Sequence, residues 1–226
     1  KWKVPADFKG TISYSMDVRR AVTVNGVTFN EGAFNPIYNA AATGDVVPRR
    51  NVVSQAKCLA CHDWLPLHGG QRLAVAECLL CHNPNSDDSS RRTAAADKVP
   101  ESIQMARMIH RIHTGEELTQ PYTIYGYGGT PYDFTEVVYP GDRRNCLACH
   151  TSAATANLPM PKGTLNVITQ KDYFTPQGPG TAACLGCHDT RDAAAHAYLN
   201  TAVFGEACGA CHGANSEWSV AVSHAR

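Results

Sequence analysis

The sequence predicts a loop-rich chain with a few short α-helices, preceded by a short β-rich segment at its N-terminus. Three observations lead to this prediction. The pattern Cys-x-x-Cys-His occurs five times between residues 58 and 212. Stretches rich in proline, glycine, asparagine and serine, such as 83–90 and 175–180, are typical of turns and loops. Residues 10–29 are rich in β-branched side chains and contain Asn25-Gly26, a hairpin-type turn.

The repeated pattern is the attachment signature of c-type haem. Two cysteine sulfurs form thioethers with one porphyrin edge, and the histidine that follows ligates the iron from the proximal side. We therefore expect a multihaem c-type cytochrome with five covalently bound haem c groups. The thioether cysteines are Cys58, Cys61, Cys78, Cys81, Cys146, Cys149, Cys184, Cys187, Cys208 and Cys211, and the proximal ligands are His62, His82, His150, His188 and His212.

Zinc sites and disulfide bonds are the competing interpretations of the ten cysteines. Paired Cys-x-x-Cys segments can build a tetrahedral zinc site, and ten cysteines could form disulfide bridges. Neither interpretation explains why a histidine follows the second cysteine every time. Because every cysteine lies in one of the five patterns, haem attachment accounts for all of them.

The other histidines match in number the sixth coordination positions that five haem irons would offer. This count predicts bis-histidine ligation, with His68, His110, His113, His196 and His224 as the distal ligands. Methionine is the rival distal ligand, and it would raise the reduction potential. The candidates are Met16, Met105, Met108 and Met160.

A helix predicted over residues 100–115 carries two of the distal candidates. Pro100 suits its first turn, and Gly115 is placed to end it. His110 and His113 lie on one face of the 3.6-residue period. Two side chains three residues apart cannot both bind one iron, so we expect them to ligate two haems held close together.

The remaining distal candidates have weaker local signals. His196 lies in an alanine-rich stretch that is expected to be helical. His68 precedes Gly69-Gly70, a turn that could direct it towards a neighbouring haem. His224 lies close to the end of the sequence, so its ligation is the most easily lost.

The expected domain division lies between residues 48 and 49. Residues 1–48 would be a β-strand segment, either the end of a β-domain or an arm that pairs with another subunit, because so few strands make no free-standing sheet domain. Residues 49–226 would form the pentahaem c-type cytochrome domain. Haem macrocycles would supply much of the buried apolar volume there, which fits a loop-rich chain.

Charge and hydropathy exclude two classes of partner. The polypeptide has 20 basic and 20 acidic residues, and no Lys/Arg-rich run suggests nucleic-acid binding. No stretch approaches the roughly 20 apolar residues that a membrane span needs.

Because haem c is attached outside the cytoplasmic membrane, we expect an extracytoplasmic location, at the cell surface or alternatively in the periplasm. An export signal would have been removed, or the chain is a piece of a longer one. Calcium at Asp87 and Asp88 is conceivable but has no support in the sequence.

Several short motifs, in their order, carry a resemblance over about residues 47–226. They include His68-Gly69, Cys81-His82-Asn83-Pro84, Met108-x-His110-x-Ile112-His113-x-Gly115, Asp142-x-Arg144-Asn145-Cys146 and Cys187-His188-Asp189. Together they resemble the decahaem outer-membrane cytochromes of the OmcA/MtrC type. In that family, haem domains with five bis-histidine haems alternate with β-barrel domains, and electrons leave the cell through the haem domains.

The expected function is therefore extracytoplasmic electron transfer to mineral or other external acceptors, with partner cytochromes as donors. An enzyme, such as a multihaem reductase of nitrite or a similar small oxyanion, is the less favoured alternative because it needs an iron with an open distal site. A subunit of a polymerised cytochrome filament is a third interpretation. A distal histidine supplied by a neighbouring chain would identify it.

Overall fold

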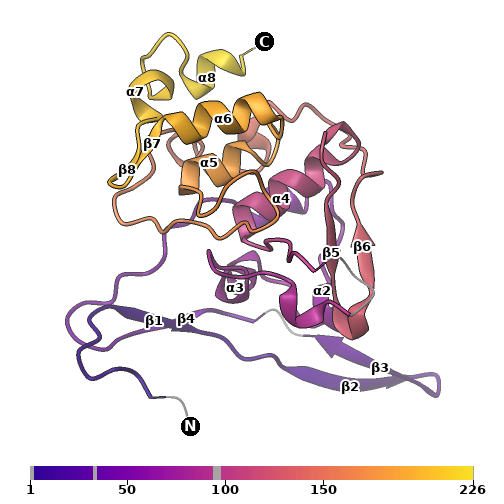
Figure 1. The fold of residues 1–226 in the computed structure, drawn as a ribbon. Helices are drawn as coiled ribbons and strands as arrows, with labels where there is room; N and C mark the ends of the chain where they lie inside the picture. Colours follow the sequence, from indigo (N-terminus) through magenta and orange to yellow (C-terminus); the bar gives the residue numbers. More distant parts are fainter. Residues whose placement is uncertain (1–2, 33–34, 94–97, 226) are drawn as a thin grey trace. The chain divides into compact units, whose positions relative to one another are not determined.

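The computed structural model describes residues 3–32, 35–93 and 98–225, and it divides into two compact units (Figure 1). Unit 1 comprises Lys1–Cys81 with Ala148–Thr151, and unit 2 comprises His82–Leu147 with Ser152–Arg226. Each unit is described by itself below. The fold is loop-rich with a few short helices and small strand pairs, as the sequence predicts.

Two antiparallel strand pairs make up the first part of unit 1. Strand β1 pairs with β4, and β2 pairs with β3. Their bounds are Thr11–Tyr14 for β1, Arg19–Val24 for β2, Val27–Gly32 for β3 and Tyr38–Ala41 for β4. Asn25 and Gly26 both have positive φ, 49° and 78°, which confirms the predicted hairpin turn. The pairing of β1 with β4 was not predicted, since the signal for β4 is only four residues long.

The rest of unit 1 consists of helical turns: α1 (Gln55–Cys58), α2 (Leu67–Gly70) and α3 (Val75–Cys81). His68 and Gly69 have φ of 53° and 81°, so the expected turn at Gly69-Gly70 is present and includes the histidine itself. An antiparallel bridge between Val53 and His150 joins residues 148–151 to this part of the chain.

Unit 2 holds the two longest α-helices of the described residues and three shorter ones. These are α4 (Met105–Thr114), α5 (Pro179–Cys184), α6 (Arg191–Leu199), α7 (Gly209–His212) and α8 (Val220–Ser223). The strand pairs are β5 (Thr123–Tyr125) with β6 (Pro131–Asp133) and β7 (Thr201–Ala202) with β8 (Gly205–Glu206). Helix α4 packs beside α5.

Helix α4 begins later than the sequence predicts. The helix does not start near Pro100: its N-cap is Gln104. The Gln104 side chain accepts a hydrogen bond from the Arg107 backbone N–H at 2.9 Å. The segment before it is extended because the Asp88 carboxylate accepts the Glu101 N–H at 2.8 Å. The predicted end is correct, since Gly115 caps the helix with φ of 50°.

A second boundary also differs from the prediction. The loop expected over residues 175–180 ends two residues early, because Pro179 and Gly180 form the first turn of α5. Proline is favoured at this position since its missing N–H would have no intrahelical partner there. The expected helix around His196 is confirmed as α6.

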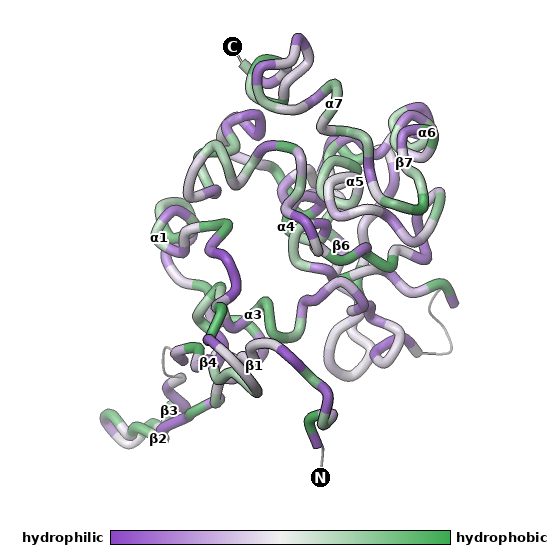
Figure 2. Tube along the Cα trace, turned by 90° about the vertical axis from the view of Figure 1, so that its left-hand side faces the viewer, coloured by the Kyte–Doolittle hydropathy of each residue, from purple (hydrophilic) through white to green (hydrophobic). Residues whose placement is uncertain are grey.

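The apolar core that the polypeptide builds for itself is small. Among the described residues, nine apolar side chains are buried: Leu73, Ala74 and Val75 in unit 1, and Met108, Tyr122, Val167, Ala182, Leu185 and Ala194 in unit 2. Figure 2 shows that apolar stretches are short and spread along the chain. No helix in the described ranges is long and apolar enough to cross a membrane. So small a core cannot by itself offset the conformational entropy of more than 200 residues.

Candidate haem-attachment sites

Three of the five motifs adopt the same helical turn. In each, the backbone N–H of the second cysteine and that of the histidine both point at the carbonyl oxygen of the first cysteine. The histidine N–H···O distances are 2.9 Å for His62, 2.9 Å for His188 and 2.8 Å for His212. A single turn therefore places two sulfurs and one imidazole next to each other, as attachment to one porphyrin requires.

Two pairs of histidine rings come together in unit 2. The ring centroids of His188 and His224 are 6.0 Å apart, and those of His196 and His212 are 6.1 Å apart. Each pair joins a predicted proximal ligand to a predicted distal one. With metal–nitrogen bonds of about 2 Å on either side, two imidazoles on opposite faces of an iron have centroids roughly 6 Å apart. The spacing of both pairs therefore fits a bis-histidine haem.

Hydrogen bonds fix the orientation of one ring in each pair. The Nδ1 atom of His212 is 2.8 Å from the Trp218 carbonyl oxygen, and that of His224 is 2.8 Å from the Val220 carbonyl oxygen. His82 and His113 make the same contact, at 2.8 Å, with the carbonyls of Ile103 and Ile109. A carbonyl accepts only, so Nδ1 carries the proton and Nε2 keeps the lone pair that binds a metal.

The surroundings of His188 also favour the neutral imidazole. Burial lowers the pKa of His188, although part of its ring stays accessible, and the nearby His224 lowers this pKa further. A neutral ring is the form that ligates iron.

A cavity of about 340 Å³ in unit 2 lies beside the first cysteine of the third motif. Its lining is mixed: Leu147, Ala156 and Val220 are apolar, Asp142 and Arg144 are charged, and Asn145, Asn157, Cys146 and His224 also contribute. Cofactor pockets are typically of about 300–1,000 Å³ and combine apolar side chains with a small number of polar groups. The residues present therefore fit a haem group at this motif.

The described residues hold no cluster of three or more histidine, cysteine, aspartate or glutamate side chains that could bind a free metal ion. Asp88, the residue considered for calcium, uses its carboxylate within the protein. It pairs with Arg92 at 2.7 Å and accepts the N–H groups of Glu101 and Tyr125 at 2.8 and 3.0 Å.

The other predicted ligands are distributed over both units. His62, His68 and His150 belong to unit 1, and His82, His110 and His113 belong to unit 2. His110 and His113 both lie on α4, and the His113 ring is edge-on to Tyr139 with centroids 5.7 Å apart. Ligation by these six residues, like ligation by the four histidines of the two ring pairs, stays a prediction.

The fourth motif packs directly on the helix that carries His110. A Cβ atom at Gly186 would lie 2.5 Å from the Cβ of His110. The Thr114 hydroxyl is 3.0 Å from the Cys187 sulfur and 3.2 Å from the Gly186 carbonyl oxygen. The sequence contains a signal for this contact: the other four motifs have alanine or leucine where this one has Gly186.

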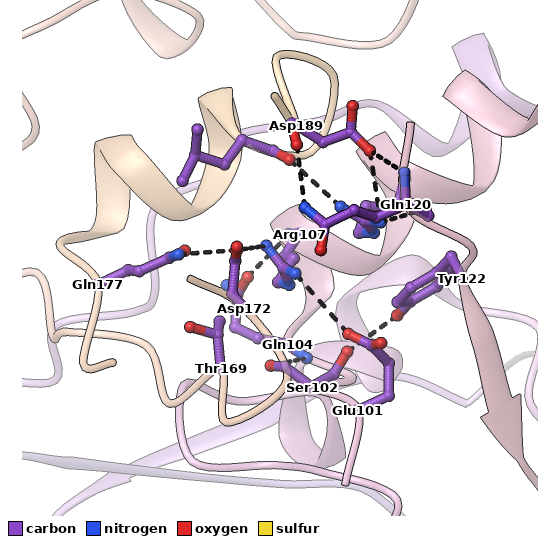
Figure 3. Close-up of polar contacts among 12 residues, drawn as sticks. Glu101, Ser102, Gln104, Arg107, Gln120, Tyr122, Thr169, Asp172, Gln177 and Asp189 are labelled. Atoms are coloured by element: carbon purple, nitrogen blue, oxygen red, sulfur yellow. Dashed lines mark hydrogen bonds and ion pairs between the residues drawn. The ribbon is translucent and has the colours of Figure 1, made fainter. Parts of the chain in front are cut away.

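The buried face of α4 carries charges that the sequence analysis did not single out. Arg107 and Arg111 are each only 2% exposed. Figure 3 shows the polar contacts of Arg107 with Asp172 and Glu101. Arg107 donates to Asp172 at 2.7 Å and lies 3.7 Å from Glu101, whose pKa is raised by burial. Two arginines four residues apart are normally a solvated helix face, so the pattern alone gives no sign of burial.

Haem accounts at once for the motifs, for the paired histidine rings and for the small polypeptide core. The protein is therefore a multihaem c-type cytochrome. A family model agrees in detail: residues 50–225 match the outer membrane cytochrome MtrC/MtrF-like family, domains II/IV, and the chain belongs to this family.

A solved structure is similar to nearly the whole chain. The crystal structure of the outer membrane decaheme cytochrome OmcA matches with a TM-score of 0.56 and 28% sequence identity. The match covers 95% of this chain but only 29% of that one, so the chain spans less than a third of the relative's length. No curated protein matches.

Proposed function

We propose that this chain is a pentahaem electron conduit that works outside the cytoplasmic membrane, with residues 49–226 as its haem domain and every iron held by two histidines. The observation that carries the proposal is the pair of ring–ring spacings of 6.0 and 6.1 Å between predicted proximal and distal ligands. Membership of an outer-membrane cytochrome family supports the location and the electron-transfer role.

The ring pairs support a proposal for the ligands of two haems. The haem on Cys184 and Cys187 would have His188 and His224 as ligands, and the haem on Cys208 and Cys211 would have His212 and His196. The three remaining distal candidates then serve the first three motifs; they are His68, His110 and His113.

The polypeptide's part in this function is to hold and orient the ligands. Bound haem supplies the one-electron chemistry. The backbone carbonyls that accept from Nδ1 keep His82, His113, His212 and His224 in the tautomer that binds iron, so ligand rearrangement does not slow electron transfer. Two histidine ligands on one iron would leave no position for a substrate and would keep the reduction potential lower than a methionine ligand would.

Partner cytochromes as donors, and mineral or soluble compounds as acceptors, follow from the family and belong to the same proposal. A multihaem reductase is the alternative function. It would need one iron without a distal histidine, and the ring pairs favour ligands on both sides for at least two haems. A filament subunit would instead take a distal ligand from a neighbouring chain.

The first prediction concerns haem content and ligation. After denaturation, the intact mass should exceed that of the polypeptide by five haem masses, because each motif supplies two thioether sulfurs. Native protein should show low-spin spectra in both oxidation states and should not bind carbon monoxide.

Two results would contradict this proposal. A smaller mass increment, or zinc in elemental analysis, would refute the haem count. A high-spin fraction that binds carbon monoxide or nitrite in undamaged protein would support the reductase. His224→Ala serves as the positive control, since it should create one open site.

A further inference from the structure

The fourth motif is fixed to α4 by a buried ion pair within unit 2. The Arg111 guanidinium donates to the Gln120 carbonyl oxygen at 2.7 Å and to the Leu185 carbonyl oxygen at 3.5 Å. Its Nη2 atom lies 3.7 Å from the Asp189 carboxylate. Leu185 is inside the motif and Asp189 follows its histidine, so the arginine contacts the attachment segment at two points.

Asp189 is held more firmly than an ordinary surface carboxylate. It is 3% exposed, and its two oxygens accept from the Thr119 N–H at 3.1 Å, the Thr119 hydroxyl at 2.9 Å and the Gln120 N–H at 2.9 Å. Three donors from two neighbouring residues therefore converge on this one carboxylate. A fixed negative charge therefore lies one residue from the proximal ligand His188.

Arg111 has a comparable environment. Burial lowers its pKa and the neighbouring Arg107 lowers it further, whereas Glu101 and Asp189 oppose this change. The Tyr122 ring adds a cation–π contact, with the guanidinium carbon 5.3 Å from the ring centroid. Because arginine stays protonated in proteins, the charge persists in the buried site.

Stability alone is a weak explanation for this pair. A buried ion pair is often no better for stability than apolar residues of the same volume, because both charges lose their hydration. Two fixed charges in a low-dielectric interior do, however, alter the free energy of any nearby change of charge. Reduction of a haem iron is such a change, since it adds one negative charge to the site.

We propose that Arg111 and Asp189 are an electrostatic tuning pair that sets the reduction potential of the haem on Cys184, Cys187 and His188 with opposite signs. Arg111 stabilises the reduced state, and Asp189 stabilises the oxidised state. The inference rests on the proposed function, because it requires that a haem is attached at the fourth motif.

The test measures individual haem potentials in the fully loaded protein. Arg111→Met should lower the potential of one haem, and Asp189→Asn should raise the potential of the same haem. The double variant should lie between the two. Paramagnetic NMR during a redox titration follows each haem separately. The variant His224→Met identifies the signals of the haem on Cys184 and Cys187, because His224 is the predicted distal ligand of that haem. The matched control is Arg20→Met with Glu31→Gln, an exposed pair that should shift no haem.

The haem potentials should follow a different pattern if the substitutions act only by loosening the structure around the fourth motif. If the pair only holds the motif in place, both single variants should shift the potential in the same direction, and that result would overturn the inference. A shift confined to another haem, or no shift with five haems present, would overturn it too. If Arg111→Met fails to fold, Asp189→Asn decides alone: a raised potential supports the inference and an unchanged or lowered one refutes it. Fewer than five haems in the unmodified chain would instead refute the proposed function.

Discussion

Substituting methionine for His110 should raise the reduction potential of one haem, and substituting methionine for His113 should raise that of a different one. A thioether ligand favours ferrous iron more than imidazole does. Axial ligands tune haem potentials over roughly 0.8 V, so each shift should be large compared with the effects of surface charge. Each variant should also disturb the potential of the neighbouring haem slightly, since two irons ligated from one helix would lie within each other's electrostatic field.

Resonance Raman or electron paramagnetic resonance spectra of the two single variants would measure this. Met108→Leu is the matched control: it removes a thioether from the buried face of the same helix with little change in volume, and it should leave every axial-ligand signal unchanged. The competing arrangement has one histidine as a ligand and the other as a hydrogen-bond donor to a propionate. In that arrangement one of the two methionine variants would keep the spectrum of the unmodified protein.

Gly186→Ala should damage a haem site to which Gly186 itself does not belong. The new methyl group would lie 2.5 Å from the Cβ of His110, so α4 or the motif must move. Overpacking of this kind costs about 1–3 kcal/mol of stability. Because His110 is a predicted ligand of a haem on another motif, its low-spin signal should weaken while all five haems remain attached.

Gly209→Ala provides the matched control for that experiment. Gly209 also lies between the cysteines of a motif, but the nearest atom to its added Cβ is 3.0 Å away, on Pro159. It should reduce stability less and leave the His110 signal intact. Equal effects of the two variants in a denaturation titration and in the Raman spectrum would show that the contact with His110 is not the cause.

The parts of the site that depend on local sequence are the ones that could be predicted. In three of the motifs the cysteines and the following histidine form a single helical turn, an arrangement that depends only on their spacing in the sequence. The Asn25-Gly26 hairpin and the end of α4 at Gly115 were also predicted correctly, because each depends on one residue that tolerates positive φ.

Features that depend on tertiary contacts could not be predicted in this way. The start of α4 moved from Pro100 to Gln104 because Asp88, distant in sequence, binds the Glu101 N–H. The burial of Arg107 and Arg111 depends on carboxylates at positions 172 and 189, which a helical pattern cannot reveal. The pairing of His188 with His224 likewise joins residues that no spacing rule connects.

The small apolar core has a consequence for the production of this protein in a cell. A chain that buries few apolar side chains of its own gains most of its folding free energy from bound cofactor, as metal-dependent domains do. Newly exported polypeptide would stay open, with its cysteines accessible to the attachment machinery, until the haems are in place. Chains that miss a haem would then be degraded first, so the steady-state amount of folded protein would follow the supply of haem and not the rate of synthesis.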